Sequence, residues 1–169
     1  FPVVAMPHMG VEYVPTPDQL KTSVYRSMID QGADMVLGDH PHWIQTSEAY
    51  KGKPIFYSMG NFMFDQQDTT EVTRSAAIDV ILEADNNDGS LEQWLSLGDE
   101  CKTFHDDCLA KAQQQNLKKI TPHYTISVVG TDDSGKITKP ATEAQTASIL
   151  ERLQWSNTKQ QLQASFTGR

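Results

Sequence analysis

Residues 16–42 read TPDQLKTSVYRSMIDQGADMVLGDHPH, a stretch that contains a predicted helix followed by a predicted strand. Its first four residues have a capping-box pattern with proline at the first helical position, which predicts that a helix starts there. Apolar residues then recur at every fourth position, which predicts one apolar face of a helix. Gly32 comes after the last of them and predicts the end of this helix. The apolar residues expected to face the core are Leu20, Val24 and Met28.

Two apolar runs flank this predicted helix, residues 2–6 before it and residues 33–37 after it. Strand, helix and strand in close succession form a βαβ unit, whose two strands run parallel with a right-handed crossover. Residues 44–58 resemble a hairpin that turns at 51–53 and would lie beside the parallel strands. The sequence therefore predicts an α/β fold.

The rest of the chain alternates predicted strands and helices. We expect one domain over residues 1–169, interrupted by a polar, Gln-rich insertion at 98–119. A capping box at Thr142 predicts a helix near the C-terminus. The other expected elements are strands at 76–84, 91–97 and 124–129, a return strand at 136–139, and helices at 106–115 and 156–166.

The composition excludes several classes of protein. The 169 residues contain 14 Lys+Arg and 22 Asp+Glu, a net charge of -8, and the longest apolar runs are far too short to cross a bilayer. An acidic chain without a basic cluster argues against nucleic-acid binding. A polyanion would have to be held by a metal or by a local pocket. An apolar run begins at Phe1, without the few polar residues that usually precede the first element. We therefore expect this chain to be a fragment of a longer protein, and removal of a signal peptide is the alternative.

Three histidines follow the two predicted parallel strands. His8 comes after the first strand, and His40 and His42 come after the second. The carboxyl edge of parallel strands is where open α/β sheets bind ligands. Pro41 should hold the His-Pro-His segment extended, with both rings on one side. These residues predict a site for a divalent metal, manganese, zinc or iron, and loop histidines held by ordinary hydrogen bonds are the alternative.

Other polar residues near these positions have two interpretations each. Glu12 could orient His8 through a hydrogen bond or lie on the surface, and Asp39 could be a ligand or a turn residue. Asn61 could contact a metal or substrate, or belong to a plain turn. The aromatic residues on and after the hairpin are expected to pack against the sheet and form the floor of the site rather than contact substrate: Trp43, Phe56, Tyr57, Phe62 and Phe64.

Cys101 and Cys108 lie seven positions apart within the predicted insertion. They could form a disulfide, which would fit an oxidising compartment, remain as free thiols, or contribute to a zinc clip. The sequence has no Walker loop, Gly-x-Ser-x-Gly elbow or Gly-x-Gly-x-x-Gly motif, which disfavours nucleotide-binding folds and serine hydrolases.

Four ordered motifs carry a family resemblance. They are HMGVEY at 8–13, PDQ at 17–19, DxGADxVxGxHPH at 30–42 and ExYxGKPIxYSxGNFxFDQ at 48–66. Together they resemble the CapA-type family of capsule, or poly-γ-glutamate, synthesis proteins. Two positions depart from the family pattern, since Met9 stands where a tryptophan is usual and Asp39 where a histidine is frequent.

The resemblance implies a metallophosphoesterase-like α/β/β/α sandwich, of which this chain would be the C-terminal part. It implies that His8, His40 and His42 are metal ligands or catalytic residues, or lie next to them. The family's opening motifs, an aspartate-bearing strand and an Asn/His segment, precede the part that matches here. They would belong to a missing N-terminal half of the same domain. The resemblance also implies a cell-envelope, extracytoplasmic location, with any membrane association through such a missing segment.

Two functions of different class follow from these observations. The first is a metal-dependent hydrolase that acts on an anionic cell-envelope polymer or a phosphoester. The second is a non-catalytic envelope module that binds or guides poly-γ-glutamate or a similar polymer. The acidic composition makes metal-free binding of a polyanion unfavourable and favours the first.

Overall fold

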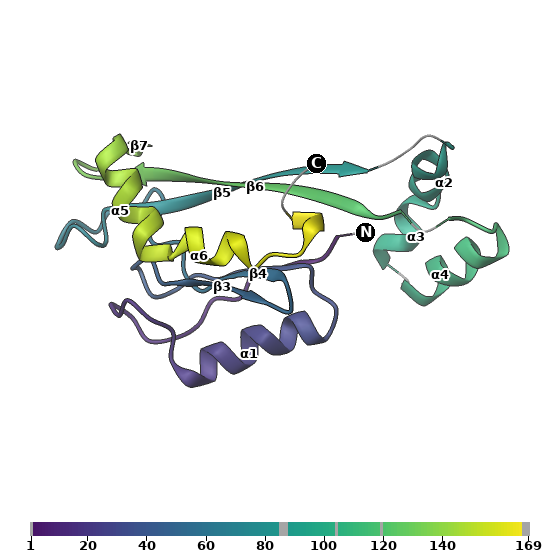
Figure 1. Cartoon of the computed structure of the whole chain (residues 1–169), viewed down its shortest axis with the longest axis horizontal. Helices are drawn as coiled ribbons and strands as arrows, with labels where there is room; N and C mark the ends of the chain where they lie inside the picture. Colours follow the sequence, from purple (N-terminus) through teal and green to yellow (C-terminus); the bar gives the residue numbers. More distant parts are fainter. Residues whose placement is uncertain (1, 85–87, 104, 119, 167–169) are drawn as a thin grey trace.

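The computed structural model describes residues 2–84, 88–103, 105–118 and 120–166, which form a mixed α/β fold with two sheets (Figure 1). The first sheet has the strand order β1-β2-β4-β3, with β1 and β4 parallel to β2 and β3 antiparallel to β4. The predicted βαβ unit and hairpin are therefore confirmed, with shorter strands. The elements are β1 (Val4–Ala5), α1 (Gln19–Asp30), β2 (Met35–Leu37), β3 (Ser47–Tyr50) and β4 (Lys53–Phe56).

Helix α1 starts and packs differently from the sequence prediction. Its N-cap is Asp18, whose carboxylate accepts a hydrogen bond from the Lys21 backbone N–H, so the capping box expected at Thr16 is wrong. The buried face consists of Lys21, Tyr25 and Ile29, one position on from the predicted face, and Leu20 is 67% exposed. The prediction followed the aliphatic residues and missed a face in which a tyrosine and a lysine stem fill the space beside the sheet.

The second sheet consists of β5 (Arg74–Ala84), β6 (Pro122–Asp132) and β7 (Lys139–Pro140), paired antiparallel in this order. The isolated bridge between Ile44 and Met59 continues the antiparallel β3–β4 register, and the bridge between Gly60 and Ser75 connects the end of this hairpin to β5 of the second sheet. Gly60 has φ of +79°, and a Cβ there would lie 2.7 Å from the Arg74 carbonyl oxygen, so this close crossing requires glycine.

The C-terminal helices lie between the two sheets, and α1 covers the other face of the first sheet (Figure 1). They are α5 (Glu143–Leu153), α6 (Trp155–Gln160) and the 3₁₀ turn η1 (Ala164–Phe166). The capping box predicted at Thr142 is confirmed with Gln145 as its partner. The main core joins Met35 and Phe56 of the first sheet to Ala76 and Ile126 of the second. From the C-terminal elements it contains Ile149, Leu153, Trp155, Leu162 and Phe166.

A small helical region extends from the far end of the β5–β6 hairpin (Figure 1). It contains α2 (Ser90–Ser96), α3 (Gly98–Thr103) and α4 (His105–Gln114), so the strand predicted at 91–97 is wrong and the later helix is confirmed. These helices share a separate cluster of Leu97, Cys108 and Ala112. A disulfide joins Cys101 to Cys108, with their Cα atoms 4.8 Å apart.

The aromatic residues of the hairpin region separate into two groups. Phe56 and Tyr57 are buried as predicted, whereas Phe62 and Phe64 are 58% and 49% exposed, so the prediction that this second pair packs against the sheet is wrong. These two lie beyond β4, in a loop that leaves the sheet. Within the described ranges, no helix has the length and apolar character needed to span a membrane.

Candidate functional site

The candidate site lies at the carboxyl edge of β1 and β2, where the predicted histidines meet. His8 and Asp39 form a parallel bridge that continues the β1–β2 pairing, and the Asp39 N–H donates to the Pro7 carbonyl at 3.1 Å. This bridge places His8 Nε2 3.2 Å from His40 Nδ1. The ring centroids of His40 and His42 are 6.3 Å apart. The structure thus brings all three histidines to one edge of the sheet.

The His-Pro-His segment reaches this arrangement through a backbone that was not predicted. His40 has φ of +95° and His42 has φ of +62°, so the extended conformation expected from Pro41 is wrong. Positive φ is uncommon for residues with a side chain, and such residues concentrate at functional sites. The Tyr13 N–H donates to the Pro41 carbonyl at 2.9 Å and ties the segment to the preceding loop.

His42 has a defined tautomer because its partner, Asn61, has a defined orientation. The Asn61 side-chain Nδ2 donates to the Val72 carbonyl at 3.1 Å and to Gln66 Oε1 at 3.2 Å. Its Oδ1 therefore faces His42 and accepts a hydrogen bond from Nδ1–H at 2.7 Å. In neutral His42, the Nε2 lone pair is then available to a metal or a proton, which is the usual way a ligating imidazole is oriented.

Glu12 lies across from the His-Pro-His pair. Its Oε1 atom is 3.9 Å from His40 Nε2 and 3.7 Å from His42 Nε2. The Glu12 side chain is 45% exposed and those of His40 and His42 are 30% and 22% exposed. The carboxylate therefore faces the two later histidines, where it would stabilise a protonated imidazole or approach a bound cation.

Three residues surround His42, of which Phe64 was expected to form the floor of the site and Tyr13 and Gln66 were not singled out from the sequence. The Tyr13 ring stacks on His42 with centroids 5.4 Å apart, and the Phe64 ring lies 5.3 Å away on a tilted plane. The Gln66 side chain donates from Nε2 to the Tyr13 hydroxyl at 2.9 Å and joins this ring to Asn61. All three residues belong to the motifs at 8–13 and 48–66, and membership in these motifs is the sequence feature that could have identified them.

A buried lysine supports the two loops that carry the site. Lys21 is fully buried, and its Nζ donates to Gln45 Oε1 at 3.1 Å and to the Asp39 carbonyl at 3.5 Å. The Gln45 Nε2 in turn donates to the carbonyls of Val14 and Thr16. Burial lowers the pKa of Lys21 to about 8, and the nearby carboxylate of Asp39 partly offsets this effect. The network connects the Glu12–Tyr13 loop to the backbone before His40.

The histidines provide ligand atoms for a metal but do not complete a metal site. The nitrogens of His8 and His40 are spaced like two neighbouring ligands of one ion, and His42 Nε2 is free to coordinate. However, no group of three or more His, Cys, Asp or Glu in the described part of the chain is arranged to hold a metal ion. Further ligands or a rearrangement of these side chains would be required.

Comparison with known proteins identifies the first part of the chain. Residues 2–66 match the family model described as bacterial capsule synthesis protein PGA_cap. This segment is therefore similar to CapA-type proteins. The PGA biosynthesis protein CapA of Bacillus subtilis (strain 168) is 45% identical over 76 residues, which is 45% of this chain and 20% of that protein. The capsule biosynthesis protein CapA of Bacillus anthracis is 45% identical over 64 residues, or 38% of this chain and 16% of that protein.

The CapA-type match and the candidate site coincide. All the site residues described above except Val72 lie within residues 2–66. The matched segments span only about a fifth or less of these curated relatives. The second sheet and the helical region at 90–118 lie outside the matched part of the family model.

Proposed function

We propose that this chain contributes the histidine-bearing part of a metal-dependent hydrolase in capsule or poly-γ-glutamate synthesis. The substrate would be an anionic cell-envelope polymer or a phosphoester. The observation that carries the proposal is the convergence of His8, His40 and His42 at the carboxyl edge of two parallel strands. The names of the CapA relatives support the capsule and poly-γ-glutamate context, and association with the cell envelope follows from that context.

The three histidines would be the ligands that this chain supplies to a divalent ion, manganese, zinc or iron. When bound, the ion would lower the pKa of a coordinated water and stabilise negative charge on the substrate. A metallophosphoesterase-like α/β/β/α sandwich is the fold we propose for the complete domain. In a protein as long as the relatives, residues outside this sequence would provide the remaining ligands, including the carboxylates.

The other residues of the site have separate roles in this proposal. Asn61 holds the His42 Nδ1 proton and leaves Nε2 directed away from the core. Glu12 faces His40 and His42 and would balance the charge of an imidazolium that transfers a proton to a leaving group. Tyr13 stacks on His42 and restricts the ring to one orientation.

The test is hydrolysis by the full-length protein with and without added metal. We expect His40→Ala to abolish metal-dependent turnover of poly-γ-glutamate or of a phosphoester, with the circular dichroism spectrum unchanged. His123→Ala is the matched control, because His123 lies on β6 outside the site. Turnover retained in His40→Ala would contradict the proposal.

A non-catalytic polymer-binding module is the second candidate. It is favoured by one observation, the lack of a three-ligand group in the described ranges. In that case, the full-length protein would bind poly-γ-glutamate equally well in the presence of a chelator and would show no hydrolysis. Loss of binding on chelation would exclude this candidate.

A further inference from the structure

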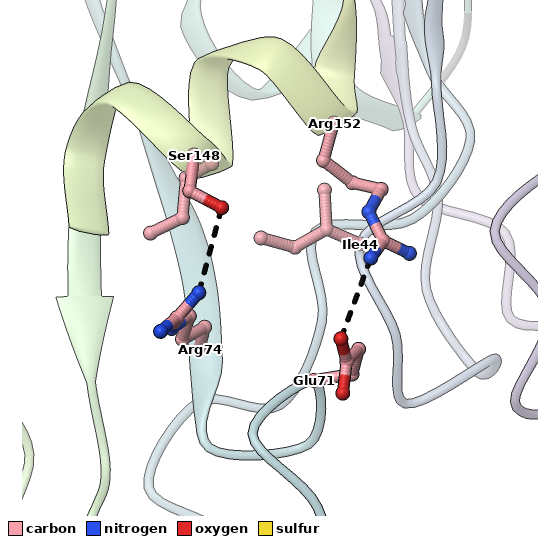
Figure 2. A pocket seen from close by; sticks show the side chains of 6 residues that line it. Ile44, Glu71, Arg74, Ser148 and Arg152 are labelled. Carbon is pink, nitrogen blue, oxygen red and sulfur yellow. Dashed lines mark hydrogen bonds and ion pairs between the residues drawn. The ribbon is translucent and has the colours of Figure 1, made fainter. Parts of the chain in front are cut away.

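A second polar site lies where α5 meets the start of β5 (Figure 2). It is a pocket of about 50 Å³, which we call the arginine pocket. Figure 2 shows Arg74 directed toward Ser148 and Arg152 directed toward Glu71. Its lining residues are Ile44, Glu71, Arg74, Ser148, Ile149 and Arg152.

One of the two guanidinium groups in this pocket, that of Arg74, has a buried donor without a partner. Arg74 donates from Nη1 to Ser148 Oγ at 3.4 Å, and its buried Nε has no hydrogen-bond partner. Arg152 Nη2 lies 3.5 Å from Glu71 Oε1, longer than a strong charge-assisted hydrogen bond. A buried donor without a partner is destabilising, so an acceptor that reached the Arg74 guanidinium would be favourable.

The size and charge of the pocket define the kind of group that it would accept. A cavity needs roughly 10–15 Å³ of this kind of volume to hold one water, so a pocket of about 50 Å³ has space for a carboxylate group. Arginine presents paired N–H donors that match the two oxygens of a carboxylate. The chain has a net charge of -8 and only four arginines, and two of them meet here.

The arginine pocket is connected to the histidine site by short segments of backbone. The bridges Ile44–Met59 and Gly60–Ser75 align residues 42–44, 59–61 and 74–75 side by side. His42 and Asn61 belong to the first two of these segments, and Arg74 belongs to the third. A single polymer chain that leaves the histidines along this surface would therefore pass close to Arg74.

A second pocket, of about 350 Å³, is lined by residues that contact both sites. Tyr13, which stacks on His42, and Trp43, whose ring lies 5.8 Å from the Arg152 guanidinium, both line it. The surface between the histidines and the arginines is therefore hollowed and partly aromatic. It could accommodate the backbone of a chain that places a charged group in the arginine pocket.

We propose that Arg74 and Arg152 form a subsite that binds one carboxylate of an anionic polymer whose chain extends to the histidine site. This inference rests on the proposed function, because it takes the polymer to be the ligand of that site. Glu71 is the natural competitor within the pocket, since its carboxylate already lies beside Arg152. A ligand carboxylate would replace or share this contact and would also accept a hydrogen bond from the Arg74 guanidinium.

The test is binding of a fluorescent γ-linked glutamate oligomer to the full-length protein, followed by anisotropy. We expect Arg74→Gln and Arg152→Gln each to weaken binding about tenfold, which corresponds to loss of one charge-assisted interaction. Glu71→Gln should strengthen binding, because it removes the competing carboxylate. Arg26→Gln is the matched control, since it removes the same charge from an exposed ion pair with Glu48 on α1 and β3.

Three further measurements make the outcome decisive. The same oligomer with amides in place of carboxylates should not bind detectably, and a shift of the Arg74 Nε–H NMR signal should accompany binding of the acidic oligomer. Arg74→Lys, which keeps the charge, should restore only part of the affinity. Equal affinities in Arg74→Gln, Arg152→Gln and Arg26→Gln would overturn the proposal, and so would displacement of the oligomer by an equal concentration of inorganic phosphate.

Failure of this inference can be distinguished from failure of the proposed function. If arginine-dependent binding is observed but no metal-dependent hydrolysis, the subsite stands and the hydrolase is excluded. If hydrolysis depends on His40 while the arginine variants bind the oligomer normally, the hydrolase stands and the subsite is excluded.

Discussion

Residues 2–66 and residues 90–118 differ in what holds them in place. The first region is short strands and loops whose conformation depends on packing against α1, the second sheet and the C-terminal helices. In its described residues, the second region is three short helices with a small cluster formed by Leu97, Cys108 and Ala112, and a disulfide. The histidines, two of them with positive φ, lie in the first region. A strained site persists where many independent contacts fix the backbone.

The largest expected effect is on the support beneath the histidines. A Cβ at Gly38 would clash with the ring and hydroxyl of Tyr25 and would lie 2.6 Å from the Tyr57 carbonyl oxygen. We expect Gly38→Ala to lower the free energy of unfolding by about 3 kcal/mol, measured by urea denaturation. The paired variant in the helical region is Gly98→Ala. Gly98 has φ of +47° and no atom within 4 Å of a built Cβ, so the cost should be about 1 kcal/mol. Equal costs would contradict the contrast between the two regions.

The second effect concerns the disulfide. Replacing both Cys101 and Cys108 by serine removes a cross-link between positions seven apart. The free energy of unfolding should fall by roughly 2.5 kcal/mol, because the unfolded chain gains the entropy of the opened loop. We expect hydrogen exchange to become faster in residues 90–118 and to remain unchanged in residues 2–66. Faster exchange around His40 in this variant would show that the two regions are coupled.

The smallest effect is a pH dependence that originates in the first region. The pKa of Lys21 is lowered to about 8 in the folded protein, from an ordinary value of 10.5, so the unfolded chain binds the extra proton between these values. Stability should therefore rise as the pH increases from about 8 towards 10. Burial raises the pKa values of Tyr25 and Tyr57, and these groups should reverse the trend above about pH 10.

Urea denaturation at several pH values would measure this slope. Lys21→Met should remove the rise between pH 8 and 10, because it keeps the length of the side chain without a titrating group. Lys159→Met on α6 is the control, since Lys159 is exposed and lies outside the Lys21–Gln45 network. An unchanged slope in Lys21→Met would assign the pH dependence to another group.

Part of the fold was predictable from the sequence because the signals were local. The proline-flanked helix, the apolar runs around it and the capping box at Thr142 each involve a few adjacent residues, and the structure contains all of these elements. The exact face of α1 was not predictable, because the space beside the sheet selected Tyr25 over Leu20. The segment at 91–97 had apolar residues compatible with either a strand or a helix, and its neighbours decided for the helix.

The sequence by itself determined which histidines would meet, because parallel strands end at a shared edge and His8, His40 and His42 each follow such a strand. It could not determine how they meet. The positive φ of His40 and His42, the Asn61 contact that fixes the tautomer, and the approach of Glu12 all depend on loops positioned by distant segments. The meeting of Arg74 with Arg152 was decided in the same way, since these residues are far apart in the chain and only the packing of α5 against β5 brings them together.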